Sequence, residues 1–228
     1  MREVLIVQNA ATGGPRRVGD WLAEDGLELE VVRAFDGAEV PASLGDRALL
    51  VLGGGYLPSD DFRAPWLPAV RELVRQAIDG GRPYLGICLG GQMLAEVAGG
   101  LVKADAGEPE NGSVPITLRP EADDDPLFHG LPQVVTAIEH HKDAVVELPE
   151  GAAWLAQTEA CPYQAFRVGP VAWGLQFHPE APPERITEWD DRGFDLAALY
   201  EQAMLDEPAA VAVWREMIRR FGAVARMS

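Results

Sequence analysis

A cysteine between two glycines is the residue of this chain best suited to covalent chemistry. Cys88 ends an apolar stretch, lies two positions from both Gly86 and Gly90, and precedes a helix-like run at residues 92–98. The pattern is typical of a nucleophile elbow, a tight strand-to-helix turn in which a Cβ at either glycine would collide with a neighbouring element. The helix N-terminus favours the thiolate over the thiol. The alternative interpretation is that Cys88 is a small buried hydrophobe, as free cysteines often are.

A histidine near the other end of the chain can act as the base that such a thiol needs. Residues 172–177 are predicted to form a strand that runs into His178, and Glu180 follows two positions later. A thiol nucleophile requires a base to take its proton, and the base requires a partner to orient it and to stabilise its cation. A His-Pro-Glu sequence alone is more often a turn. Together with the elbow, it predicts a catalytic triad of Cys88, His178 and Glu180.

Short apolar runs alternate with helical spacing in the part of the chain that precedes the cysteine. Residues 4–8, 29–32 and 48–52 are predicted to be strands, and residues 18–27 and 66–77 have the spacing of amphipathic helices. Strands that alternate with helices indicate a parallel, doubly wound α/β sheet.

Residues 86–92 and 176–180 together resemble the motifs of the class I glutamine amidotransferase family, most closely the stand-alone branch similar to the glutaminase domain of GMP synthase. The resemblance extends over about residues 3–190. It implies a flavodoxin-like α/β fold, in which a doubly wound and mostly parallel sheet carries helices on both faces. We therefore expect a single domain over residues 1–228, with a C-terminal helical extension at 191–228.

The C-terminal extension carries two stretches with amphipathic helical spacing, residues 196–204 and 209–221. The fold of the family does not require them. They could cap the pocket, mediate a homodimer or close the core, and the last two roles are favoured.

The third predicted strand runs into Gly53, Gly54 and Gly55, at the edge where open α/β sheets bind ligands. By resemblance to the family, the backbone amides of Gly54 and Leu89 form an oxyanion hole, which stabilises the negative oxygen of a tetrahedral intermediate. Gly55, where the family often has proline, and Gln92 are expected to border the substrate. The resemblance implies no metal and no organic cofactor.

The segment His141-Lys142-Asp143 matches a family His-Gly-Asp segment that helps to hold the substrate by backbone contacts. Lys142 in place of glycine is the clearest departure from the family. A cation there could exclude glutamine, change its pose or recognise an additional carboxylate. The neighbouring pair His140 and His141 suggests a metal site, but adjacent side chains diverge on a strand and no Glu-x-x-His or His-x-His spacing is present. No metal is expected.

Two of three further residues, Glu110 and Gln164, allow more than one interpretation. Glu110 begins a short segment that resembles a family segment near the pocket, and an exposed polar turn is an equally good interpretation. Gln164 could position the triad, contact the substrate or be a strand-edge amide. Cys161 lacks flanking glycines and an elbow, so we interpret it as structural.

The composition describes a globular domain and excludes several classes of partner. The 228 residues, 47% of them hydrophobic, are enough for one α/β domain with a sizeable core. A net charge of −17 argues against nucleic acid, whose phosphates would be repelled. No apolar run approaches the ~20 residues of a membrane span, and no signal-peptide pattern opens the chain. With only two cysteines, a disulfide framework is not expected, and a reducing cytoplasm is the predicted location.

The sequence leaves three functions open. In the first, glutamine is hydrolysed through a thioester on Cys88 and ammonia passes to a separate synthetase, because the chain has no P-loop lysine motif and too few residues for an acceptor domain. In the second, the protein is a stand-alone hydrolase of a γ-glutamyl peptide, amine or polyamine conjugate, which Lys142 mildly favours. In the third, it is a catalytically silent binding or regulatory module, against which the complete triad argues.

Overall fold

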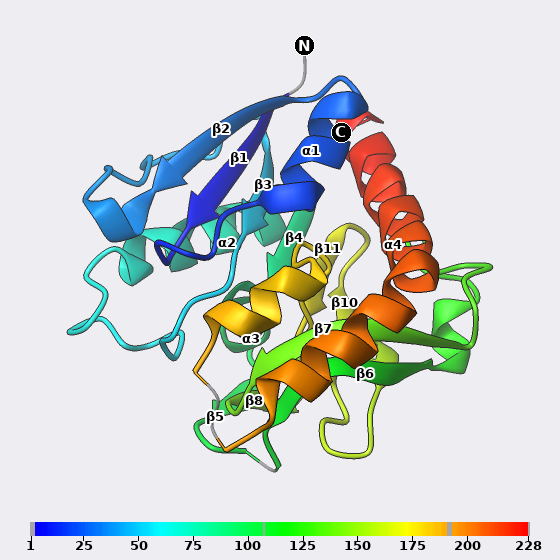
Figure 1. Cartoon of the computed structure of the whole chain (residues 1–228). Coiled ribbons are helices and arrows are strands. Elements are labelled where there is room, and N and C mark those ends of the chain that lie inside the picture. The colour runs from blue at the N-terminus through cyan, green and yellow to red at the C-terminus, as the bar shows by residue number, and fades with distance from the viewer. Residues whose placement is uncertain (1–2, 107, 191–192, 228) are drawn as a thin grey trace.

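A nine-stranded sheet forms the body of the molecule (Figure 1). The computed structural model describes residues 3–106, 108–190 and 193–227. In spatial order, the strands of this sheet are β2 (Glu28–Arg33), β1 (Glu3–Gln8), β3 (Ala48–Val51), β4 (Tyr84–Ile87), β11 (Ala172–Leu175), β10 (Ala165–Val168), β9 (Ala153–Gln157), β6 (Glu110–Leu118) and β7 (Val134–His141). A smaller sheet pairs β5 (Leu101–Lys103) with β8 (Ala144–Glu147). The helices are α1 (Arg16–Glu24), α2 (Leu67–Asp79), α3 (Leu89–Val97) and α4 (Leu196–Met227), with 3-10 helices η1 (Ala34–Asp36), η2 (Pro120–Ala122) and η3 (Pro183–Glu188).

The large sheet changes character at β11. From β2 to β11 every pairing is parallel, as the alternation of strands and helices predicts. From β11 to β7 every pairing is antiparallel. The expected α/β fold is confirmed, and the antiparallel strands extend it on one side. The carboxyl ends of the parallel strands meet at one edge, which is where an open α/β sheet binds ligands.

The inner strands of the parallel half, β1, β3, β4 and β11, are almost wholly buried because helices cover both faces, whereas the edge strand β2 carries charged residues. In β1, Val4 and Ile6 join the core cluster that contains residues of α1 and α4. Leu5 and Val7, which point the other way, join the cluster that contains residues of α2 and α3. A strand buried on both faces needs a continuous apolar run, which β1 has at residues 4–7.

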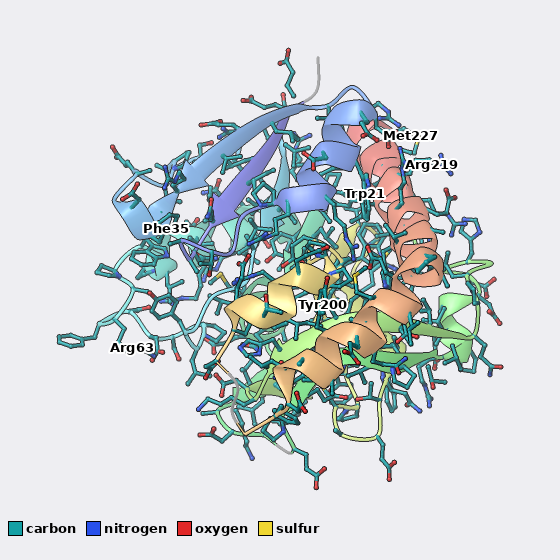
Figure 2. The ribbon with its side chains drawn as sticks, viewed as in Figure 1. Trp21, Phe35, Arg63, Tyr200, Arg219 and Met227 are labelled. Atoms are coloured by element: carbon teal, nitrogen blue, oxygen red, sulfur yellow. The ribbon has the colours of Figure 1, made fainter. Side chains whose placement is uncertain are left out.

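The first two helices form where their apolar spacing predicts them. The buried residues of α1 are Val18, Gly19, Trp21 and Leu22, and those of α2 are Leu67, Val70, Leu73, Val74 and Ala77. This spacing places one apolar stripe on each helix. Trp21, labelled in Figure 2, lies where α1 meets α4, so the first and last helices of the chain share one face of the sheet.

The C-terminal segment is one helix, and the prediction of two separate helices at residues 196–204 and 209–221 is wrong. Pro208 lies inside α4 without ending it. Proline removes one helical hydrogen bond and bends the axis, but a helix continues when packing supports the turns on both sides. Figure 1 shows α4 changing direction partway along its length. Although α4 has 32 residues, neither it nor any other helix in the described ranges is apolar enough to cross a membrane.

The second half of α4 is part of the main core. Its fully buried residues are Trp214, Met217, Ile218 and Phe221. They pack with β1, β4 and β11 in one cluster. Closing the core, one of the two favoured roles, is therefore a role that α4 has. The homodimer remains a prediction.

Candidate active site

Cys88 occupies a strained turn between β4 and α3. Its φ and ψ are +52° and −109°, a combination that side chains other than glycine rarely adopt and that is typical of a nucleophile elbow. A Cβ at Gly86 would lie 2.4 Å from the carbonyl carbon of Gly90, and a Cβ at Gly90 would lie 2.1 Å from the carbonyl oxygen of Val51. Both glycines are therefore required by the close approach of α3 to the sheet, as the spacing predicts.

Parallel pairing of β4 with β11 brings the cysteine and the histidine segments to the same edge. Ile87 is in register with Leu175, the last residue of β11, and the amide of Cys88 donates to the carbonyl of Leu175 at 2.7 Å. The chain then continues to His178, whose amide donates to the carbonyl of Ile138 on β7 at 2.8 Å. The antiparallel half of the sheet thus holds the histidine loop, while the parallel half holds the elbow.

The imidazole of His178 is bound by the carboxylate of Glu180. The distance from Nδ1 to Oε1 is 2.7 Å, and both side chains are largely buried. Burial acts to lower the pKa of His178, but the Glu180 carboxylate and the contact with Cys88 outweigh it and raise this pKa well above its ordinary value. The pair is therefore suited to carry a proton as an imidazolium.

Cys88 and His178 converge beside Gly53. A Cβ built on Gly53 would lie 3.2 Å from Cε1 of His178 and 3.4 Å from Cβ of Cys88. The proximity of Cys88 contributes to the raised pKa of His178, yet Nε2 has no hydrogen-bond partner among the described residues. The two side chains are therefore close without a hydrogen bond of ordinary geometry between them, and catalytic hydrogen bonds often tighten only when substrate binds.

The predicted oxyanion residues Gly54 and Leu89 are neighbours. A Cβ on Gly54 would lie 3.1 Å from Cδ2 of Leu89 and equally close to Cβ of Asn9. Leu89 is the first residue of α3, where a backbone N–H has no acceptor within the helix. Gly55 is exposed and a Cβ there would touch nothing, so packing does not require glycine at that position.

Asn9 holds the glycine loop, and sequence reasoning missed this role. Its side chain is fully buried, donates from Nδ2 to the carbonyl of Leu52 at 2.8 Å, and accepts from Nε1 of Trp66 at 3.0 Å. Leu52 directly precedes the glycines, so Asn9 ties the loop to the end of β1. A polar residue directly after an apolar strand at the ligand-binding edge was the signal that could have identified it.

A cavity of about 390 Å³ opens over the cysteine. Every predicted site residue except Leu89 borders it, and additional walls come from Arg16 and from the segment between Arg185 and Asp190. The volume falls in the range of small-molecule sites, roughly 300–1,000 Å³. The cavity is therefore large enough for a compact amino-acid substrate together with a further group.

Lys142 lies at the rim of this cavity and is engaged by a neighbouring loop. Its Nζ is 2.8 Å from Oδ1 of Asp105, and both side chains are substantially exposed. The amide of Asp105 in turn donates to Oδ1 of Asp143 at 2.9 Å. The loop at residue 105 thus orients the segment at 141–143, and the charge of Lys142 has a carboxylate beside it.

Glu110 is buried at the start of β6, so the interpretation as an exposed polar turn is wrong. Its Oε2 accepts from Gln164 Nε2 at 2.6 Å and lies 3.1 Å from His141 Nε2. Glu139 lies behind them, fully buried and without a hydrogen-bond partner for either oxygen among the described residues. Burial and the nearby Glu110 carboxylate raise the pKa of Glu139 well above its ordinary value. This cluster supports the wall of the site from inside, and Gln164 belongs to it.

Glu110, His141 and Cys161 form the set of side chains here that could hold a cation. One ligand atom from each lies within 4.8 Å of the others. Glu110 is already hydrogen-bonded by two neighbours, and burial raises the pKa of the Cys161 thiol well above its ordinary range, which disfavours the thiolate that a metal binds. We therefore interpret the set as structural support. Sequence spacing missed it because its members come from separate strands and loops.

Comparison with known proteins agrees with these features. The family model described as glutamine amidotransferase class-I matches residues 17–188. One subunit of the glutamine-hydrolyzing GMP synthase of Archaeoglobus fulgidus is 36% identical over 161 residues, which are 70% of this chain and 79% of that protein. Gamma-glutamyl peptidase 3 of Arabidopsis thaliana is 27% identical over 211 residues, which are 87% of this chain and 84% of that protein.

The fold is also that of solved structures. A glutamine amidotransferase from Thermotoga maritima has a TM-score of 0.86 at 24% identity, over 97% of this chain and 98% of that chain. This likeness shows the fold alone. The chain spans only 20% of the GMP synthases of Porphyromonas gingivalis that it matches, and 57% of the corresponding GMP synthase subunit of Methanopyrus kandleri.

Proposed function

The chain belongs to the class-I glutamine amidotransferase family, and on that premise we propose that it hydrolyses the γ-carboxamide of glutamine and supplies the ammonia to a separate protein. The observation that carries this proposal is the convergence of Cys88 and His178 beside Gly53, with Glu180 bound to the imidazole. The strained elbow and the adjacent glycine loop support the same chemistry.

The reaction follows from this arrangement. His178 takes the proton of Cys88, and the sulfur attacks the carboxamide carbon while the amides of Gly54 and Leu89 hold the oxyanion. The C–N bond then breaks, and His178 gives its proton to the departing nitrogen, which leaves as ammonia. Water, deprotonated by His178, attacks the γ-glutamyl thioester, and the proton returns to the sulfur as glutamate leaves. Glu180 keeps the imidazole oriented and stabilises its cation.

A partner that accepts ammonia would be a separate chain. The similarity to a protein named as one subunit of GMP synthase supports a division of labour between two polypeptides. Glutamine is then the substrate, and an ammonia-accepting synthetase is the partner.

A second candidate function is supported by a different set of observations. The chain is similar over 87% of its length to a protein named gamma-glutamyl peptidase 3, the cavity has room beyond the cysteine, and Lys142 replaces the family glycine. In this alternative the same thioester chemistry releases an amine or a peptide in place of ammonia.

The experiment that tests the proposal measures glutamate release from glutamine and from a panel of γ-glutamyl amines and peptides. Cys88→Ala is the inactive variant, and Cys161→Ala is the matched control with the other cysteine removed. Turnover of free glutamine that depends on Cys88 supports the amidotransferase. Turnover of one conjugate with silence on glutamine favours the hydrolase. Silence on every substrate, with Cys88 no more reactive than a model thiol, would favour the silent binding module.

A further inference from the structure

Gln176 contacts the sulfur of Cys88 through its side-chain amide. Gln176 directly follows β11, is 3% exposed, and donates from Nε2 to Cys88 Sγ at 3.6 Å. Its Oε1 accepts a hydrogen bond of 3.1 Å from Nε2 of Gln92, which also donates to the backbone carbonyl of Asp143 at 2.8 Å. Two buried amides therefore connect the sulfur with the peptide of Asp143 in the cavity wall.

The orientation of both amides is determined by the last acceptor in this series. A backbone carbonyl can only accept, so Gln92 must turn its NH2 group toward Asp143. The same NH2 group reaches Gln176, which must therefore present its oxygen to Gln92. The NH2 group of Gln176 is thereby directed at the sulfur, where it can donate.

We propose that Gln176 is a catalytic residue that stabilises the Cys88 thiolate by donating an N–H hydrogen bond to it, and that Gln92 is a positioning residue that holds Gln176 in this orientation. The inference rests on the proposed role of Cys88 as the nucleophile. A charged acceptor forms a stronger hydrogen bond than a neutral one, so the bond favours the thiolate over the thiol. Because Cys88 is only 8% exposed, a fixed donor from the protein takes the place of water.

This assignment also gives Gln92 a role besides lining the cavity. Both hydrogens of its NH2 group are used, one toward Asp143 and one toward Gln176. Only Oε1 is left to face a ligand. The segment at residues 141–143, which is expected to hold the substrate, is thus connected to the nucleophile through two side chains.

The test measures how the rate of alkylation of Cys88 by iodoacetamide depends on pH, between about pH 5 and pH 10. It uses a Cys161→Ala background, so that one cysteine reacts. The variant is Gln176→Met, which keeps the length of the side chain but cannot donate. Gln133→Met, at an exposed position, is the matched control.

In Gln176→Met, the midpoint of the profile is expected to move to higher pH, and alkylation at neutral pH to slow on the order of tenfold. The plateau at high pH stays the same, because the fully formed thiolate still reacts. Gln133→Met follows the parent throughout. Gln92→Met moves the midpoint in the same direction by a smaller amount.

A profile of Gln176→Met that superposes on that of the parent overturns the inference, and so does a uniform loss that includes the plateau, since that indicates a structural role. If Gln176→Met does not fold, Gln176→Glu serves in its place and is expected to move the midpoint further, because it sets a carboxylate against the sulfur. Alkylation needs no substrate. A parent that shows this behaviour but hydrolyses no γ-glutamyl compound would refute the proposed function, and only the stabilisation of the Cys88 thiolate by Gln176 would stand.

Discussion

The ring of Phe177 packs against the indole of Trp214, with ring centroids 4.6 Å apart. Phe177 directly precedes His178, and Trp214 belongs to α4. The indole N–H of Trp214 also donates to the carbonyl of Thr136 on β7 at 2.9 Å. The C-terminal helix thus supports the residue next to the proposed base. The C-terminal helix is therefore part of the framework that supports the site.

Trp214→Ala is expected to destabilise the protein by about 3–5 kcal/mol, the usual loss for removing a large buried aromatic side chain. Activity should fall together with stability, because the support of the histidine loop is lost. Chemical denaturation gives the free energy of unfolding. Phe62→Ala, at a position that is 99% exposed, is the matched control and should unfold like the parent. A Trp214 variant as stable as Phe62→Ala would contradict the role of α4 in the core.

Gly90→Ala and Gly55→Ala should behave in opposite ways. A Cβ at Gly90 would lie 2.1 Å from the carbonyl oxygen of Val51, whereas a Cβ at Gly55 would meet nothing within 4 Å. We expect Gly90→Ala to lose activity and at least about 2 kcal/mol of stability, since α3 must move away from the sheet. Gly55→Ala should fold and retain activity. Thermal unfolding and glutamate release measure both, and a tolerated Gly90→Ala would contradict the tight elbow.

Glu180→Gln is expected to lower kcat by about 10²–10⁴-fold and to move the alkaline limb of the kcat/KM profile to lower pH. The carboxylate raises the pKa of His178, so its removal lets the imidazolium lose its proton earlier. The same linkage acts on stability. The stabilisation that the raised pKa of His178 gives to the folded protein is fully present below the pKa of histidine in the unfolded chain, about 6.5. It is lost as pH rises through the pKa of His178 in the folded protein.

Glu180→Gln should therefore cost more stability at mildly acidic pH than at alkaline pH. Denaturant titrations at the two pH values measure the difference. An alkaline limb that stays in place in Glu180→Gln would show that another group is responsible for it.

Glu139→Gln is expected to change how stability depends on pH. The pKa of Glu139 is raised by burial and by Glu110, so the folded protein keeps a proton that the unfolded chain releases above its ordinary pKa of about 4.3. The stability of the parent must then fall as pH rises from that value through the folded pKa. A glutamine cannot ionise, so the free energy of unfolding of the variant should rise relative to that of the parent between pH 5 and pH 8. If the free energy of unfolding differed between variant and parent by the same amount at pH 5 and at pH 8, Glu139 would not carry a proton in the folded protein.

Asn9→Ala is expected to lower kcat by about tenfold with a smaller effect on KM, because the loop that carries Gly54 loses its tie to β1. Asn9→Asp keeps an acceptor for Trp66 but cannot donate to Leu52 and should resemble Asn9→Ala. Steady-state kinetics on the substrate identified by the panel separate kcat from KM. Full activity in both variants would show that the loop is held by its other contacts.

Local patterns in the sequence determined the elbow at Cys88, the strand that leads to His178, and the parallel half of the sheet. These features depend on sterics within a few residues or on periodicity along one element, so a single sequence contains the information. Glycines at positions 86 and 90 are one example, since the turn itself demands them. The roles of the individual site residues are proposals that build on these local features.

Tertiary structure alone decided which distant residues touch. The donor from Gln176 to Cys88 joins positions 88 residues apart, and Asn9 reaches the carbonyl of Leu52 across 43 residues. The cluster around Glu110 and the continuous helix through Pro208 also depend on contacts between elements. Such contacts are set by strand register and by packing against the sheet, neither of which a local pattern encodes, because the free energy that selects them comes from burying surfaces of separate elements against each other.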